Sequence, residues 1–190
     1  MAERPGDPKG IAFLGDVLVY LHHGRTPSPS IYERVREGLL ALKPKDGERE
    51  PMVVVTHSFG SEILYDLLTS GGLNGLIIDL WATVGAQTSL FAEMRLFGAM
   101  PGDIPKDTQN YSLGRPSGVT KWVNIYDPAD ALSYKHQPVF GDVTDIPVSE
   151  GGNLTNAHGH YFVTVSFYET VLWELRGEME SVASRASAEL

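Results

Sequence analysis

Short apolar runs alternate with stretches of helical spacing along most of the chain. Residues 52–55, 76–84 and 121–126 have the length and apolar content of buried strands. Helices are predicted at 59–68, directly after the first of these runs, and at 161–180 near the end of the sequence. Because strands that alternate with helices favour a parallel sheet, we expect an α/β fold of three layers, with helices flanking the sheet.

Three other segments give weaker or mixed patterns. Residues 30–42 are predicted to form a helix, with Ser30 as its N-cap and Glu33 placed as in a capping box. Residues 11–21 fit both a strand and one face of a helix, so both assignments stay open. Residues 139–148 are predicted to form an extended segment or a hairpin.

An irregular insert is expected over 85–118. Its apolar residues recur at near-helical spacing, at Leu90, Phe91, Met94, Phe97 and Met100. These side chains would suit a lid over an acyl-binding groove, since methionine and phenylalanine adapt to apolar ligands. They would equally suit a helix that packs on the sheet, and we favour the packing interpretation.

Composition excludes several classes of function. The net charge is −9 and no basic stripe is present, so we do not expect nucleic-acid binding. There is no cysteine, which excludes disulfides and thiol chemistry and fits a reducing compartment. The polar start of the sequence has no signal-peptide pattern, and Asp79 interrupts the longest apolar run, so we expect a cytoplasmic protein of one domain, 1–190, without a transmembrane segment. The six histidines lack metal-ligand spacing, and we predict no metal and no cofactor.

The most informative stretch joins the first apolar run to the helix that follows it. Ser58 stands at the turn between a β-branched run and a helix, and a tight strand-to-helix turn of this kind exposes the serine hydroxyl as a nucleophile. The N–H of Phe59 would then point at the position of an oxyanion, beside the positive end of the helix dipole. The alternative is that Ser58 only caps the helix.

Residues 56–60, Thr-His-Ser-Phe-Gly, resemble the nucleophile elbow of α/β-hydrolases in its lipase and esterase form, x-His-Ser-x-Gly. Thr56 is larger than the small residue usual at that position. Residues 81–87 are similar to the Thr-x-Gly-Ser-Pro segment of such lipases, with Gln87 in place of the proline. The resemblance implies a serine esterase that acts through an acyl-enzyme, with a triad in the order serine, acid, histidine.

The same resemblance implies the other two members of the triad. The loop after strand 121–126 is similar to the lipase acid loop and selects Asp130, while Asp127 is the alternate and is expected to shape the loop as an Asx turn. A His-x-x-Tyr pattern before the closing helix selects His158, with His160 as the alternate.

The front of the expected fold is short. Only about fifty residues precede Ser58, whereas α/β-hydrolases place several strands and a second oxyanion donor there. We therefore expect an α/β-hydrolase-like fold that lacks the usual first strands, with strand 52–55 at an edge of the sheet. Such an edge invites pairing with a second copy or with another chain that completes the sheet. The alternative function is a catalytically impaired hydrolase fold that serves in binding or assembly.

Overall fold

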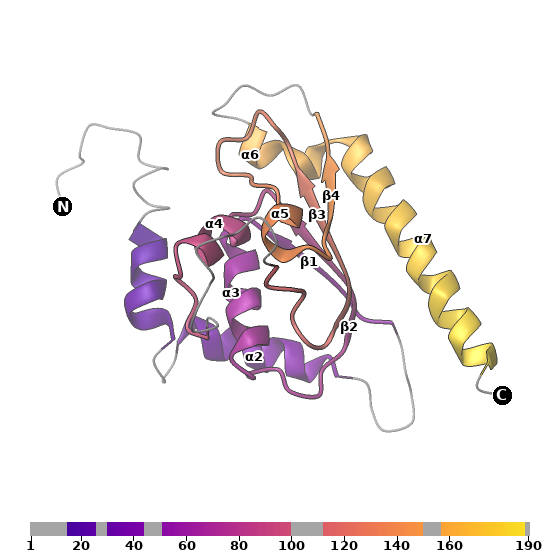
Figure 1. Ribbon diagram of the computed structural model, residues 1–190, viewed down its shortest axis with the longest axis horizontal. Coiled ribbons are helices and arrows are strands. Elements are labelled where there is room, and N and C mark those ends of the chain that lie inside the picture. Colours follow the sequence, from indigo (N-terminus) through magenta and orange to yellow (C-terminus); the bar gives the residue numbers. More distant parts are fainter. Residues whose placement is uncertain (1–14, 26–29, 44–50, 100–111, 150–156, 189–190) are drawn as a thin grey trace. The chain divides into compact units, whose positions relative to one another are not determined.

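The computed structural model describes residues 15–25, 30–43, 51–99, 112–149 and 157–188 (Figure 1). The chain divides into two compact units, residues 1–42 and 43–190. None of the helices in the described ranges combines the length and the apolar composition needed to cross a membrane.

The described part of the first unit is helical. Residues 15–19 are α-helical and continue into a π-helical turn, η1 (Tyr20–Gly24), so the helical assignment of 11–21 is correct from residue 15 onward; residues 11–14 lie outside the described part. Helix α2 (Ile31–Ala41) follows, and the Oγ of Ser30 accepts a hydrogen bond from Glu33 N at 3.1 Å. The predicted helix and its serine cap are thereby confirmed.

Among its described residues, the second unit contains a parallel sheet of four strands in the order β1-β2-β3-β4 (Figure 1). The strands are β1 (Val53–His57), β2 (Ile78–Val84), β3 (Val119–Tyr126) and β4 (Thr144–Pro147). The predicted parallel sheet is confirmed, and β1 is one of its two edges among the described residues. Every residue of β2 is buried, which agrees with its place in the interior of the sheet.

Of the two alternatives for residues 139–148, the hairpin is wrong, and the extended one is correct only for the later part of the segment. The segment contains the end of a short helix, α5 (Gln137–Phe140), and then β4, which runs parallel to β3. The helix forms because Phe140 is fully buried with its ring 4.8 Å from that of Trp122, and it ends at Gly141, whose φ of +76° suits glycine.

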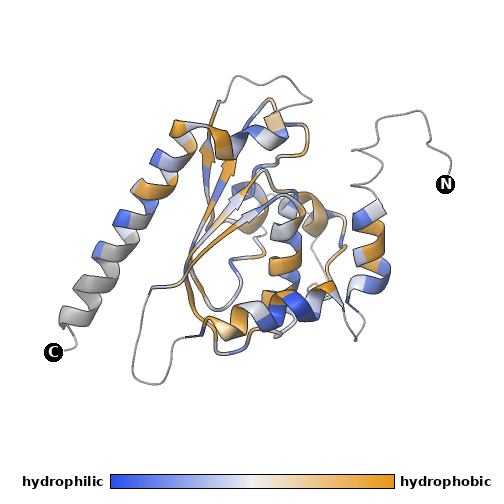
Figure 2. Ribbon diagram, turned by 180° about the vertical axis from the view of Figure 1, so that it is seen from behind, coloured by the Kyte–Doolittle hydropathy of each residue, from blue (hydrophilic) through white to orange (hydrophobic). Residues whose placement is uncertain are grey.

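Helices flank the sheet on both faces. On one face, α3 (Phe59–Thr69) and α5 place Tyr65 and Phe140 against Trp122, which stacks on Trp81 at 4.4 Å. On the other face, α7 (Val165–Ala188) packs Phe167 with the strand residues Val84 and Ile125. Figures 1 and 2 show α3 and α7 on opposite sides of the strands, with hydrophobic residues prominent on α3. This arrangement is an α/β architecture.

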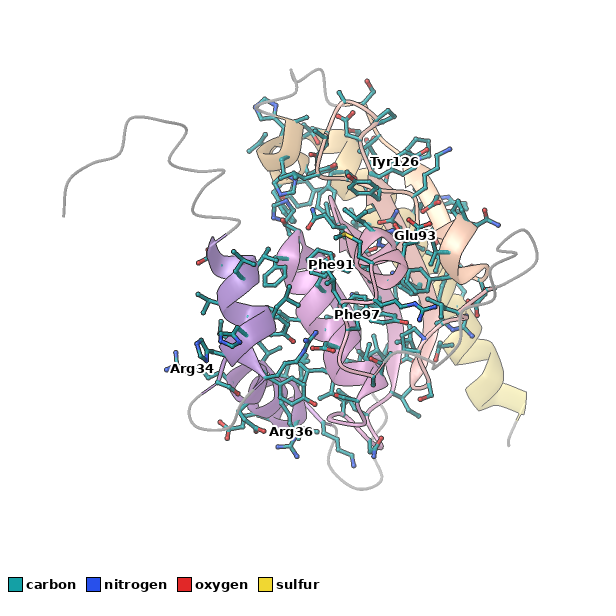
Figure 3. All side chains as sticks on the ribbon, turned by 60° about the vertical axis from the view of Figure 1, so that its left-hand side comes forward. Arg34, Arg36, Phe91, Glu93, Phe97 and Tyr126 are labelled. Atoms are coloured by element: carbon teal, nitrogen blue, oxygen red, sulfur yellow. The ribbon has the colours of Figure 1, made fainter. Side chains whose placement is uncertain are left out.

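The described part of the predicted insert packs on α3. Helix α4 (Thr88–Glu93) buries Phe91, whose ring is 5.9 Å from that of Phe59, and Phe97 lies 4.4 Å from Tyr65 (Figure 3). These contacts favour packing over a lid for residues 85–99. Met100 lies outside the described residues.

The closing helix begins later than predicted. A short helix, α6 (Ala157–His160), and a 3₁₀ turn, η3 (Tyr161–Val163), precede α7. Thr164 is extended, with ψ of 145°, and separates the turn from the long helix. This break leaves the fully buried Tyr161 near the carboxyl ends of the strands, where polar side chains gather.

Candidate active site

Ser58 occupies the single position between β1 and α3. Its φ of 51° and ψ of −134° are unusual for a residue other than glycine, and such conformations concentrate at functional sites. The Ser58 N–H donates to the carbonyl of Val84 at 2.9 Å, which fixes the turn to the end of β2. The side chain makes no capping hydrogen bond to α3, so the capping interpretation does not account for it.

Thr56 is accommodated in the elbow by hydrogen bonds. Its hydroxyl accepts from the indole N–H of Trp81 at 2.9 Å and lies 2.9 Å from the hydroxyl of Ser61 on α3. The departure from a smaller residue at this position therefore links the strand to the helix behind the serine.

His158 connects Ser58 with Asp130. Its Nε2 is 2.8 Å from Ser58 Oγ, and its Nδ1 is 2.8 Å from Asp130 Oδ2. The residues come from three places: Ser58 from the elbow after β1, Asp130 from the loop after β3, and His158 from α6. The structure thus brings together the three side chains that the sequence selects, at hydrogen-bond distance.

The environment of Asp130 favours its ionised form. Burial alone would raise the pKa of this carboxyl, but hydrogen bonds from His158, from Leu132 N at 2.9 Å and from the Tyr161 hydroxyl at 2.9 Å outweigh burial and hold the pKa below its usual value. An ionised carboxylate only accepts hydrogen bonds, so Nδ1 of a neutral His158 carries the proton. The lone pair of Nε2 then faces the hydroxyl of Ser58.

The two alternates have other surroundings. Asp127 Oδ1 accepts from Ala129 N at 2.8 Å, which is the Asx turn expected for this residue. His160 is the last residue of α6, two positions beyond the ring that contacts Ser58.

Tyr161 has a role in the site that the sequence did not assign to it. Its hydroxyl donates to Asp130 Oδ2 and accepts from Asp127 N at 3.0 Å, so it joins both aspartates. Burial raises the pKa of Tyr161, and the phenol stays a neutral donor. The available signal was the His-x-x-Tyr pattern, which served only to select His158.

Gly85 leaves the space in which the acid and the histidine meet. A Cβ at this position would lie 2.8 Å from the ring of Tyr161, 3.2 Å from Asp130 Oδ2 and 3.4 Å from His158 Nδ1. Its φ of +56° is also one that other residues rarely adopt. The glycine in the segment 81–87 therefore has a steric reason as well as a conformational one.

His57 supports the backbone of His158. Its Nε2–H donates to the carbonyl of His158 at 2.9 Å, and the two rings are 4.8 Å apart. Burial lowers the pKa of His57, which favours the neutral ring that makes this contact. The ring of Phe162 lies nearly perpendicular to the same imidazole, with the two ring centroids 5.2 Å apart.

The geometry is suited to nucleophilic chemistry on a carbonyl carbon. A serine hydroxyl on a strained turn faces one nitrogen of an imidazole whose other nitrogen contacts a buried carboxylate. Within the described ranges, no group of three or more histidine, aspartate or glutamate side chains could hold a metal ion. In comparisons with known proteins, no family model, no curated protein and no solved structure matches this chain.

Proposed function

We propose that the protein is a serine hydrolase that cleaves a carboxylic ester through an acyl-enzyme. The observation that carries this proposal is the position of His158, within 2.8 Å of both Ser58 Oγ and Asp130 Oδ2. The strained backbone of Ser58 supports it, because a nucleophile elbow has such a residue at its apex.

In the proposed reaction, Ser58 Oγ attacks the ester carbonyl carbon while His158 Nε2 takes the hydroxyl proton. Asp130 holds the ring and stabilises the imidazolium. The N–H of Phe59, the first residue of α3, stabilises the oxyanion together with the helix dipole. His158 returns the proton to the leaving alcohol, and a water molecule then hydrolyses the acyl-enzyme by the same steps.

We further propose that the fold is related to that of α/β-hydrolases but lacks their usual first strands. The parallel sheet, the elbow after one strand and the acid after another support this relation. In that fold a loop before the elbow supplies a second oxyanion donor. The described elements before β1, η1 and α2, are helices, and none of the described strands precedes the elbow strand.

A fluorophosphonate probe tests the nucleophile directly. The wild-type protein is expected to be labelled at Ser58, and Ser58→Ala is expected to carry no label, with Ser70→Ala, at the exposed far end of α3, as the matched control. Absence of Ser58-dependent labelling in the folded wild-type protein would refute the proposal.

The acid is tested by a pair of aspartate variants. Asp130→Asn is expected to lower the rate of labelling by several orders of magnitude, because an amide NH2 that faces Nδ1 donates to it and imposes the other ring tautomer, and because the amide does not stabilise the imidazolium. Asp127→Asn is expected to have a much smaller effect, through the Asx turn. The opposite ranking would transfer the role of acid to Asp127.

We also propose that the edge strand β1 pairs with a second copy or with another chain. The position of β1 at an edge of the sheet, among the described residues, supports this proposal, and Val55 on this strand is 41% exposed. Light scattering is expected to give a mass above 20.8 kDa, the mass of one chain. A fully active species at the monomer mass would contradict it.

The alternative, an impaired hydrolase fold used in binding or assembly, predicts no labelling of Ser58. It would gain support if His158 pointed away from Ser58. The observed contact of 2.8 Å instead favours the hydrolase proposal.

A further inference from the structure

Glu62 is a buried carboxyl group on the first turn of the helix that carries Ser58. It has no exposed surface, and its Oε1 accepts hydrogen bonds from Gln87 N at 2.9 Å and from the Thr88 hydroxyl at 3.1 Å. Its other oxygen, Oε2, has no hydrogen-bond partner, and no ion pair of the described residues includes it. The carboxyl group therefore joins α3 to the start of α4 without a compensating cation.

Such surroundings favour a neutral carboxyl group. Removal from water disfavours the ionised form and raises the pKa of Glu62 to about 8, although hydrogen bonds from backbone N–H groups and from Thr88 act in the opposite direction. Gln87 Oε1 is also buried without a partner. Glu62 Oε2 and Gln87 Oε1 are thus two buried acceptor oxygens without a donor. Protonation of Glu62 turns one of its carboxyl oxygens into a hydroxyl, which supplies one donor.

Gln87 extends this connection to the loop of Asp130. Its Nε2 donates to the carbonyl of Leu132 and to that of Gly85, the latter at 2.9 Å. Leu132 N in turn donates to Asp130 Oδ1 at 2.9 Å. Leu132 is thus held through its carbonyl by Gln87 while its N–H orients the carboxylate.

We infer that Gln87 is a positioning residue that holds the loop of Asp130, and that Glu62, as a neutral carboxylic acid, fixes Gln87 to the helix of Ser58. The inference rests on the proposed function, because Asp130 is the acid of the proposed triad. It assigns a specific task to the residue that replaces the proline of the lipase segment. The hydrogen bonds run from Glu62 through Gln87 and Leu132 to Asp130, and from there through His158 to Ser58.

Four variants test the inference. Gln87→Met keeps the length of the side chain but removes both amide hydrogens. Glu62→Gln keeps a carbonyl oxygen that can accept from Gln87 N and Thr88, whereas Glu62→Ala removes it. Glu93→Ala, at an exposed position of α4, is the matched control. Two quantities are measured on folded protein: the rate of fluorophosphonate labelling, and the proton NMR signal of His158 Nδ1–H, which reports its hydrogen bond to Asp130.

Gln87→Met is expected to lower the labelling rate about tenfold to a hundredfold and to weaken or shift the His158 signal, because small misplacements of a catalytic group have effects of that size. Glu62→Ala is expected to behave in the same way. Glu62→Gln is expected to keep a labelling rate within about threefold of wild type, because its uncharged carbonyl oxygen still accepts these hydrogen bonds. Glu93→Ala is expected to change neither the labelling rate nor the His158 signal.

Two results would overturn the inference. A folded Gln87→Met protein with the wild-type His158 signal would remove the positioning role. A loss in Glu62→Gln as large as that in Glu62→Ala would show that the charge, and not the neutral acid, is required. If Gln87→Met does not fold, the two Glu62 variants decide alone. If the wild-type protein carries no Ser58-dependent label, the proposed function fails, and the NMR signal still tests the positioning.

Discussion

The raised pKa of Glu62 predicts a specific dependence of stability on pH. In the unfolded chain this carboxyl group titrates near its ordinary value of 4.5, whereas in the folded protein it titrates at about 8. Between these values the folded protein holds a proton that the unfolded chain has released. Raising the pH through this window therefore favours unfolding, and the contribution is lost fully once the pH exceeds about 8.

The magnitude follows from the separation of the two values. About 3.5 pH units separate 4.5 from 8, and each is worth about 1.4 kcal/mol, so the folded state loses on the order of 5 kcal/mol across the window. Glu62→Gln has no titrating group at this position, so the variant should not lose this stability as the pH rises. The difference in unfolding free energy between Glu62→Gln and wild type should thus grow in favour of the variant as the pH rises from 4.5 to 8.

Urea unfolding at a series of pH values measures this difference, since groups that titrate in both proteins cancel. Glu93→Gln, at an exposed position, should give a curve parallel to wild type. If the curves of wild type and Glu62→Gln also run parallel between pH 4.5 and 8, Glu62 does not retain its proton, and the neutral acid is refuted.

Four further substitutions test other parts of the structure. Gly85→Ala should lower the free energy of unfolding by about 2 kcal/mol or more, since it combines a positive φ with a Cβ 2.8 Å from the ring of Tyr161. It should also lower the rate of Ser58 labelling. An unchanged melting temperature would contradict the steric role. Tyr161→Phe should cost about 1–2 kcal/mol in urea unfolding and slow labelling severalfold, because it removes a donor to the acid; an unchanged labelling rate would show that the other donors suffice. His136 is fully buried, and burial lowers its pKa from 6.5 to about 4 against the opposing effects of the Asp145 carboxylate and of backbone hydrogen bonds with Lys135 and Tyr134. Stability therefore falls as the pH drops through that window. His136→Phe should remove a loss of about 3 kcal/mol, and an unchanged loss of stability in acid would contradict this account. Ser30→Ala should destabilise α2 by about 1 kcal/mol, because Glu33 N loses its hydrogen bond to the N-cap. Circular dichroism on heating measures this loss, and an unaltered helix signal would contradict the prediction.

Three of the four strands in the described part of the chain could be predicted, because each is an apolar run long enough to show its type. Strand β4 has only four residues, and its polar Asp145 accepts hydrogen bonds from Asn124 Nδ2 and from the backbone N–H of His136. Its place in the sheet depends on these distant partners, which a local hydrophobic pattern does not contain. The late start of α7 has a similar origin, because the inward position of Tyr161 is set by contacts with the loop of Asp130.

The proposed triad was accessible from sequence because each member stands beside an element with a recognisable boundary. Ser58 follows a strand, Asp130 lies in the loop after another, and His158 precedes a helix. Glu62 and Gln87 offered no such signal. A glutamate in the first turn of a helix is ordinarily explained by the helix dipole, and nothing in its identity indicates complete burial or a partner 25 residues away.

The end of β2 determines how the proposed site is assembled. Gly85 leaves space for the acid and the histidine, Ala86 O accepts from Tyr134 N at 3.0 Å, and Gln87 holds Leu132. Asp130 lies in the loop after β3, but contacts with the end of β2 fix its position as well. Because parallel strands end at one edge of the sheet, a single turn after β2, which lies between β1 and β3, can contact both the elbow and the acid loop. A substitution in this turn is expected to disturb Ser58 and Asp130 together, so its effect on labelling should be non-additive with that of Asp130→Asn, whereas a change elsewhere on α4 should be additive.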